Sequence, residues 1–151
     1  MMGLKMLLLL GSLLAVLEVR LVVSSHHGRS MPGSPSNVSR TDPGLLLAVL
    51  SAAGFYNNQS NDAFLFKPSA IDRAQRQLVK GLKYIVDLEI SRTVCRKRDD
   101  NHDNLSNCDL QPEGRLHQTF QCHTEVWVVP WEGQTTTLKL NCKTNLHHLR
   151  L

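Results

Sequence analysis

After residue 25, the sequence has no apolar run that approaches the length of a transmembrane helix, and no segment recurs at solenoid spacing. It also has no Cys-x-x-Cys pair, so its cysteine spacing fits a structural zinc site poorly. Beyond its leader the chain keeps about 125 residues, which is enough for one hydrophobic core and too few for two. We therefore expect a single soluble domain that holds no metal.

A strong charge of either sign is also missing. The chain has 17 Lys and Arg and 13 Asp and Glu, and removing Lys5, Glu18 and Arg20 with the leader leaves 15 and 12, a net charge of +3. The basic cluster at 96–98 is followed by three aspartates within 99–103, which cancel its field beyond a Debye length of about 8 Å. We therefore expect neither a nucleic-acid nor a membrane partner.

Residues 1–25 have the pattern of a secretory signal peptide. Lys5 precedes the apolar residues 6–17, and charged residues interrupt the run before it could span a bilayer. The small residues at 23–25 suit a signal peptidase, so we predict cleavage near Ser25. The expected product is a secreted protein that acts extracellularly or, after uptake, in endolysosomes.

The exported part contains four cysteines, for which oxidation is the default. Sequence alone allows three pairings. A turn at 131–133 lies midway between Cys122 and Cys142, which would place those two opposite each other across a hairpin. Cys95 would then pair with Cys108, so we expect two disulfides.

Three Asn-x-Ser triplets are candidate glycosylation sites in an exported chain, although such triplets also occur by chance. Each lies in a segment expected to be a loop or a helix end. Their asparagines are Asn37, Asn58 and Asn104.

Local patterns predict one helix after a flexible arm. Residues 26–41 are rich in Ser, Pro and Gly and have little to bury, which is typical of a mobile segment. Asp42 is suited to cap a helix and Pro43 to start one, and apolar residues follow at helical spacing. The predicted helix covers 42–57, and the amide-rich residues 57–62 end it.

The rest of the sequence alternates between apolar and polar residues, as the strands of a half-buried antiparallel sheet do. We expect a charged excursion with a helical turn at 96–114 and a loose tail at 146–151. The expected strands run from a break at Pro68 to Val79, over 82–95, from Leu116 to 128 and, after a turn at 130–133, through Leu138, Leu140 and Cys142. The predicted fold class is α+β, with one helix across a twisted antiparallel sheet of four to five strands over residues 42–145.

Seven histidines could suggest an enzyme, but the predicted elements do not bring them together. A Cys–His nucleophile pair needs a free thiol, and the predicted disulfides use all four cysteines. Residues 142–145 resemble a secreted ribonuclease only superficially. The histidines lie in the two tails, in the charged excursion and on the outward face of one strand, at His26, His27, His147, His148, His102, His117 and His123. We expect no enzymatic activity and no cofactor.

Two predicted hairpin tips carry apolar residues where the chain reverses direction. They are Gln77-Leu78-Val79-Lys80-Gly81 and Pro130-Trp131. Taken alone, the first could be an ordinary turn with Gly81 at a positive φ, and Trp131 could be one exposed aromatic side chain. Adjacent hairpins would bring the tips side by side, and Gly33 lies on an arm that can reach them. The three pieces would then form one wedge-shaped edge.

This combination resembles the type 2 cystatins, which are secreted protein inhibitors of papain-like cysteine proteases. Gln77, Val79 and Gly81 match the first binding loop of that family, Pro130-Trp131 matches the second, and Gly33 takes the place of the N-terminal glycine. The resemblance covers essentially the whole mature chain, including both disulfides. It implies that the partners are cathepsins.

The resemblance also implies a mechanism of occlusion. The arm would place Met31 and Pro32 in the non-primed pockets, Val79 would sit over the catalytic cysteine–histidine pair, and Trp131 would pack on the primed side. Pro32 departs from the aliphatic residue that many relatives carry, which leaves the strength against particular cathepsins open.

Several segments are most similar to the leukocystatin branch of the family. They are 42–44, 61–67, 79–84 and 125–131. Members of that branch carry two additional cysteines that support a disulfide-linked dimer, and this chain lacks them. We therefore expect a monomer.

A second site follows from Ser60-Asn61-Asp62, because several type 2 cystatins use this asparagine as bait for legumain, an asparagine-specific cysteine protease. The plain alternative is a turn that ends the helix, and a glycan on Asn58 would interfere. The alternative for the whole chain is a cystatin-fold secreted binding module without protease inhibition, like a cathelicidin proregion or a reproductive-tract secretory protein. Such relatives typically lack part of the three-piece edge.

Overall fold

The computed structural model describes residues 33–99 and 102–144. Contacts divide the chain into two units, Met1–Met31 and Pro32–Leu151, and every described residue belongs to the second. The predicted signal peptide, its cleavage near Ser25, Met31 and Pro32 of the arm, and the tail at 146–151 lie outside the described residues. Within the described ranges, no helix has the length and apolarity needed to cross a bilayer.

Helix α2, Pro43–Gln59, forms where the sequence predicts it. The side-chain oxygen Oδ1 of Asp42 accepts a hydrogen bond of 3.0 Å from the backbone N–H of Leu45, which satisfies one of the free donors of the first turn. Pro43 follows at a position that needs no backbone donor. At the other end, the backbone N–H of Ser60 donates to the carbonyl of Tyr56 over 2.9 Å and closes the last turn.

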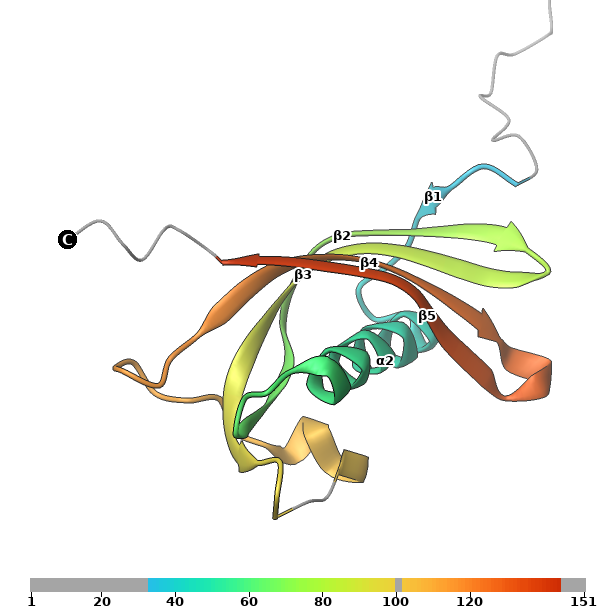
Figure 1. The fold of residues 1–151 in the computed structure, drawn as a ribbon. Coiled ribbons are helices and arrows are strands. Elements are labelled where there is room, and N and C mark those ends of the chain that lie inside the picture. Colours follow the sequence, from blue (N-terminus) through green and yellow to red (C-terminus); the bar gives the residue numbers. More distant parts are fainter. Residues whose placement is uncertain (1–32, 100–101, 145–151) are drawn as a thin grey trace, which may run out of the picture. The chain divides into compact units, whose positions relative to one another are not determined.

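Five antiparallel strands form one sheet in the order of the sequence, β1-β2-β3-β4-β5. Figure 1 shows α2 lying against one face of this curved sheet. The strands are β1 (Ser36–Asn37), β2 (Phe64–Val79), β3 (Gly81–Arg96), β4 (Thr119–Val129) and β5 (Gln134–Thr144). The predicted α+β class, with one helix across a twisted antiparallel sheet, is confirmed.

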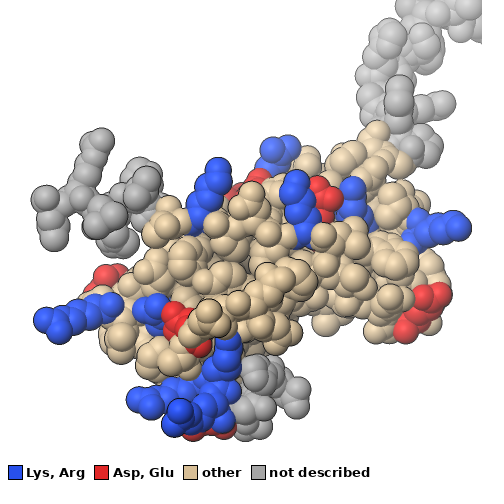
Figure 2. All heavy atoms as spheres, viewed as in Figure 1, with Lys and Arg blue, Asp and Glu red and all other residues tan. Residues whose placement is uncertain are grey.

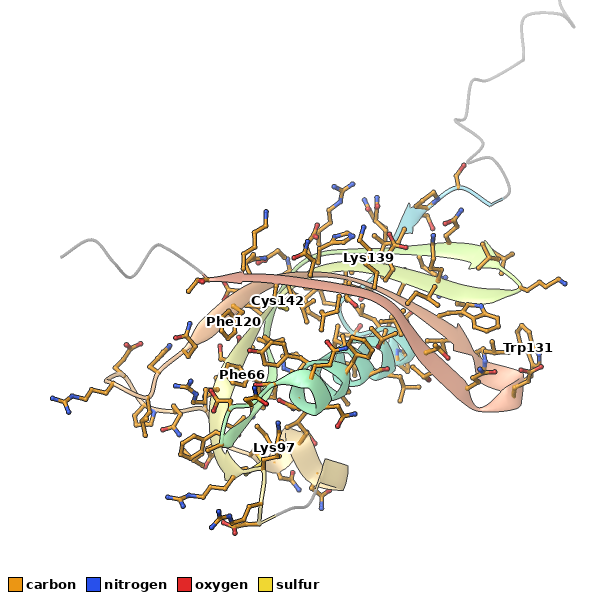
Figure 3. All side chains as sticks on the ribbon, viewed as in Figure 1. Phe66, Lys97, Phe120, Trp131, Lys139 and Cys142 are labelled. Carbon is orange, nitrogen blue, oxygen red and sulfur yellow. A yellow bond between two sulfur atoms is a disulfide. The ribbon has the colours of Figure 1, made fainter. Side chains whose placement is uncertain are left out.

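The core lies between α2 and the sheet. Four alternating residues of β3 are almost fully buried and meet the inner face of the helix, as the period of two predicts. They are Tyr84, Val86, Leu88 and Ile90. Beside them, the rings of Tyr56, Phe66 and Phe120 pack with centroids 5.1 to 5.6 Å apart, and the last two are labelled in Figure 3.

The two disulfides join Cys95 to Cys108 and Cys122 to Cys142. The second joins directly opposite residues of β4 and β5, as the position of the turn indicates. The first anchors the excursion after β3, in which a short 3-10 helix, η1 (His102–Asn107), provides the expected helical turn.

Two strand starts were predicted wrongly, and the last strand, which forms where it was predicted, contains a bulge; each difference has a local reason. Strand β2 starts at Phe64 and passes through Pro68, because β1 pairs only with residues 75–76 and leaves the edge of β2 free at the proline. Leu116 is exposed because β4 starts only at Thr119. Leu138 is 56% exposed, since a register shift between the partners of Glu125 and Val126 makes it the extra residue of a bulge.

The segment predicted to be a flexible arm contains a short strand in its described part. Residues 36–37 pair with β2, and the backbone N–H of Val38 donates to the carbonyl of Ala74 over 3.2 Å. The chain is therefore attached to the sheet only three residues after Gly33.

Candidate functional site

The first predicted tip is the turn of the β2–β3 hairpin. Leu78 pairs with Leu82 and Val79 with Gly81, which leaves Lys80 at the end of the hairpin. Leu78 is 70% exposed and Val79 is 38% exposed. Consecutive residues of a strand point to opposite faces of the sheet, so alternation alone would leave only one of the two exposed; the exposure of both is a property of the tip.

Gly81 holds this tip close to the neighbouring β4 strand. Its φ is 102°, in the region that favours glycine, and a Cβ built there would lie 2.8 Å from the carbonyl oxygen of Val128. The indole Nε1 of Trp127 donates a hydrogen bond of 2.7 Å to the carbonyl of Lys80, across the same gap. The close approach of the backbone at Gly81 and the hydrogen bond from Trp127 hold the first tip against β4.

Gly33 lies beside the same tip. The side-chain amide of Gln77 donates to the Gly33 carbonyl over 2.6 Å, although the two residues are 44 positions apart in sequence. Gly33 has a φ of 89° and is exposed. Gln77 therefore connects the start of the described chain to the first hairpin.

The second predicted tip is the connection between β4 and β5. Pro130 starts a single turn of 3-10 helix, η2 (Pro130–Glu132), and Gly133 closes it with a φ of 61°. Trp131 is 71% exposed, whereas Val129, two residues earlier, is almost fully buried. A large aromatic side chain thus projects from a base that is held by the core.

Both tips lie at the same end of the sheet. Leu82 of β3 faces Val128 of β4, so the two hairpins turn at nearly the same level. Figure 1 shows both turns at the right-hand end of the sheet, and Figure 3 places Trp131 there. In Figure 2 this end is mostly uncharged, with single charged side chains separated by uncharged surface. The structure therefore brings Gly33, 77–81 and 130–131 to one edge.

A polar network beneath this edge was missed by the sequence analysis. Asp42 caps α2 and also accepts a hydrogen bond from the hydroxyl of buried Tyr84, at 3.0 Å, and one from Arg76 at 3.1 Å. Burial raises the pKa of Tyr84; the hydrogen bond with Arg76 lowers it in part, and the one with Asp42 raises it. This network joins the helix start to the last residues of β2, next to Gln77.

The second candidate loop lies at the other end of α2. Asn61 is exposed between two residues whose side chains are fixed. The hydroxyl of Ser60 accepts from the backbone N–H of Asp62 at 3.0 Å, and the Asp62 carboxylate binds the backbone N–H of Phe64 at 2.9 Å and the guanidinium of Arg92 at 2.5 Å.

Lys97 adds a third support to the same loop. Its ammonium donates to the carbonyl of Ser60, and its backbone N–H donates to the carbonyl of Ala63 at 2.8 Å. Figure 3 places Lys97 below α2 and away from Trp131, in line with its bond to Ser60, the residue that ends the helix. The asparagine is therefore presented by a loop with little freedom, far from the two tips.

The three candidate glycosylation asparagines are all exposed. Asn37 lies on β1, Asn58 in the last turn of α2 and Asn104 in η1.

The described residues offer little for catalysis. Within 33–99 and 102–144, no group of three or more His, Cys, Asp or Glu residues could hold a metal ion, and every cysteine is in a disulfide. The Nδ1 of His123 lies 2.6 Å from Asp87 on the outward face of the sheet, while His117 lies before β4 and is not in a strand. The remaining histidines lie outside the described side chains.

Comparison with known proteins gives a consistent result. A family model described as the cystatin domain matches residues 33–131. Human cystatin F, also called leukocystatin, is 48% identical over 116 residues, which are 77% of this chain and 79% of the human protein. Mouse cystatin C is 34% identical over 131 residues, 87% of this chain and 91% of the mouse protein.

A solved structure agrees with these sequence relatives. The crystal structure of dimeric human cystatin F superposes with a TM-score of 0.73 at 42% identity, over 84% of this chain and 99% of that chain. The fold, the match over 33–131 and the relatives together show that the chain belongs to the cystatin family.

Proposed function

We propose that this protein inhibits papain-like cysteine proteases of the cathepsin type by filling their active-site cleft with the edge formed by Gly33, residues 77–81 and residues 130–131. Membership of the cystatin family implies inhibition of cysteine proteases. The observation that supports the finer proposal is the attachment of Gly33 and of β4 to the first tip through Gln77 and Trp127.

In this mechanism each part of the edge has one role. The arm before Gly33 occupies the non-primed pockets, Val79 covers the catalytic cysteine and histidine, and Trp131 packs on the primed side. No peptide carbonyl is presented to the protease thiolate, so the inhibitor is bound and not cleaved. The protein then acts by binding alone and is not an enzyme.

The exposure of the tips is consistent with tight binding. Leu78 and Trp131 keep 70% and 71% of their surface exposed, so both can lose contact with water on docking. A buried Trp at the centre of an interface is often worth more than about 2 kcal/mol. Tips held by a sheet and by cross-strand hydrogen bonds also lose little freedom on binding, which lowers the entropic cost.

A direct assay tests this proposal. Purified mature protein at nanomolar concentration is expected to reduce the activity of papain and of cathepsin L. No loss of activity at micromolar excess would reject inhibition as the function.

Removing the residues before Gly33 separates an inhibitor from a non-inhibitory scaffold. An inhibitor of this design loses affinity for its protease when the arm is shortened, because the arm contributes its own contacts. A cystatin-fold binding module such as a cathelicidin-like proregion would bind its partner equally well with and without these residues.

Legumain is a second candidate target, and the geometry of the Asn61 loop favours it. An inhibitor of an asparagine-specific protease needs an exposed asparagine on a rigid backbone. The contacts of Ser60, Asp62, Arg92 and Lys97 make the loop rigid. The corresponding variant is Asn61→Ala, which is expected to abolish legumain inhibition while papain inhibition stays unchanged. Loss of both activities would show that the two sites are not separate.

We also propose that the protein is secreted and is a monomer. It would act outside cells or, after uptake, in endolysosomes. All four cysteines pair within the chain, so none is free for a bridge between copies, whereas the solved relative is a dimer. Sedimentation equilibrium of the mature protein is expected to give the mass of one chain at micromolar concentration; twice that mass would contradict the proposal.

A further inference from the structure

Two ionisable side chains of opposite sign lie on the two hairpin tips. They are Lys80, at the end of the first hairpin, and Glu132, directly after Trp131. Every other residue of 77–81 and 130–133 is uncharged, and Figure 2 shows this end of the molecule with single charged side chains on uncharged surface. Charges are depleted at the centre of protein interfaces, so these two should influence which partner fits the edge.

Both charges are available to a partner. The side chains of Lys80 and Glu132 are exposed. Within 33–99 and 102–144, neither of them makes a side-chain hydrogen bond or an ion pair. The two charges therefore do not neutralise each other, and no other described residue neutralises them.

The two side chains differ in how easily they avoid burial when the tips dock. The long stem of Lys80 lets its ammonium reach water at the rim of an interface. The side chain of Glu132 is shorter and starts from η2, whose turn is closed by a 3.2 Å hydrogen bond from the backbone N–H of Gly133 to the carbonyl of Pro130. The carboxylate therefore stays close to Trp131.

A partner that covers Trp131 must also accommodate this carboxylate. Trp131 is 71% exposed and contributes to binding only when a partner covers it. A carboxylate that loses water without gaining a counter-charge is costly, and a like charge opposite it is worse. A basic group at the same place gives an attraction instead. The difference between these cases is a difference in affinity, which is what makes an inhibitor selective.

We propose that Glu132 makes the second tip select papain-like proteases that carry a lysine or an arginine on the primed-side rim of the cleft, close to the surface on which Trp131 packs. This inference rests on the function proposed above, because it requires the second tip to dock on the primed side. It goes further by giving the charge of the target's rim and the residue that recognises it.

Matched forms of one protease test the proposal. At each uncharged rim position beside the primed subsites of papain, one form receives a lysine and another a glutamate, and the inhibition constant is measured for both. At one or more of these positions the unaltered inhibitor is expected to bind the lysine form about tenfold more tightly, near the lower end of the coupling found for close charge pairs. Glu132→Gln should remove this preference, and Glu132→Lys should reverse it.

Glu113→Lys is the matched control. It changes the net charge by the same amount as Glu132→Lys, and Glu113 is exposed in the segment before β4, whereas the second tip follows the other end of that strand. This control is expected to keep the preference of the unaltered inhibitor. The preference should also shrink as salt is raised, because ions screen the contact; a change in the shape of the tip would not respond to salt in this way.

The possible results separate this inference from the function on which it rests. No inhibition of any papain form would reject binding in the cleft, and the inference with it. Inhibition of all forms without a preference, or the same preference after Glu132→Gln, would overturn the role of Glu132 alone. Loss of the preference in Glu113→Lys would also overturn it, because net charge and not position would then decide.

Discussion

At the scale of single residues, Gly44 and Gly81 lie where two parts of the fold come close together. Gly81 lets the first tip lie against β4, since a Cβ there would be 2.8 Å from the Val128 carbonyl. Gly44 and Gly54 lie in the same helix but in opposite surroundings. A Cβ on Gly44 would be 2.1 Å from the hydroxyl of Tyr84, whereas one on Gly54 would meet nothing within 4 Å.

The same substitution at these two helix positions should therefore have opposite effects. Gly54→Ala is expected to stabilise the protein by up to about 1 kcal/mol, because alanine favours the helix. Gly44→Ala is expected to cost about 1–3 kcal/mol, because the new methyl group displaces buried Tyr84 from its bond to Asp42. Urea unfolding of protein without glycans measures both. Stabilisation at both positions would show that helix propensity outweighs packing at Gly44.

The two tyrosines predict how stability depends on alkaline pH. Burial raises the pKa of both Tyr56 and Tyr84, so the folded protein keeps phenol protons that the unfolded chain loses. This contribution to stability is fully present below the unfolded pKa of about 10 and is lost as pH rises through the folded values. The free energy of unfolding should thus fall above about pH 10.

Ultraviolet titration of tyrosinate checks this directly, because the chain has only these two tyrosines. The folded protein should titrate at higher pH than the chain in denaturant. Equal midpoints in the two states would refute the assigned effect of burial.

At the scale of elements, the sequence predicts burial better than it predicts contacts between strands. The buried face of β3 could be predicted because the alternation of apolar and polar residues is visible within the strand's own sequence. In the same way, Asp42-Pro43 indicated the start of α2. The break expected at Pro68 was wrong because a free edge tolerates proline. The bulge at Leu138 was missed because it depends on the register with β4.

In the candidate site, too, the sequence predicts local features but not contacts between distant residues. Turn residues in the sequence indicated the two tips, and adjacent hairpins indicated one common end. The roles of Gln77 and Trp127 could not be read in this way, since each bonds to a residue more than 40 positions away. One weak signal was available for Trp127, which occupies an outward position in the alternation of β4 and so is not a core aromatic.

The bond between Gln77 and Gly33 gives a prediction about coupling between the arm and the first hairpin. Gln77→Met keeps the length of the side chain but removes the donor. It is expected to weaken papain inhibition about fivefold, in line with the net value of one hydrogen bond. The inhibition constant measures this. In protein that lacks residues 1–33 the same change should have no effect; an equal loss there would mean that Gln77 acts without the arm.

At the scale of the whole molecule, the described domain carries its two candidate sites at opposite ends of α2. The edge at one end depends on the sheet and its two hairpins, and the Asn61 loop at the other depends on Arg92 and Lys97. Few residues are shared between them, so each should respond to its own substitutions.

The inhibition constant for papain, compared between Trp131→Ala and Leu138→Ala, tests the central claim most directly. Both side chains are large, apolar and exposed, at 71% and 56%, but only Trp131 lies on a tip. Trp131→Ala is expected to weaken inhibition more than tenfold, since it removes an interface anchor, and Leu138→Ala to leave it unchanged. Equal inhibition by both variants and the unaltered protein would contradict the account.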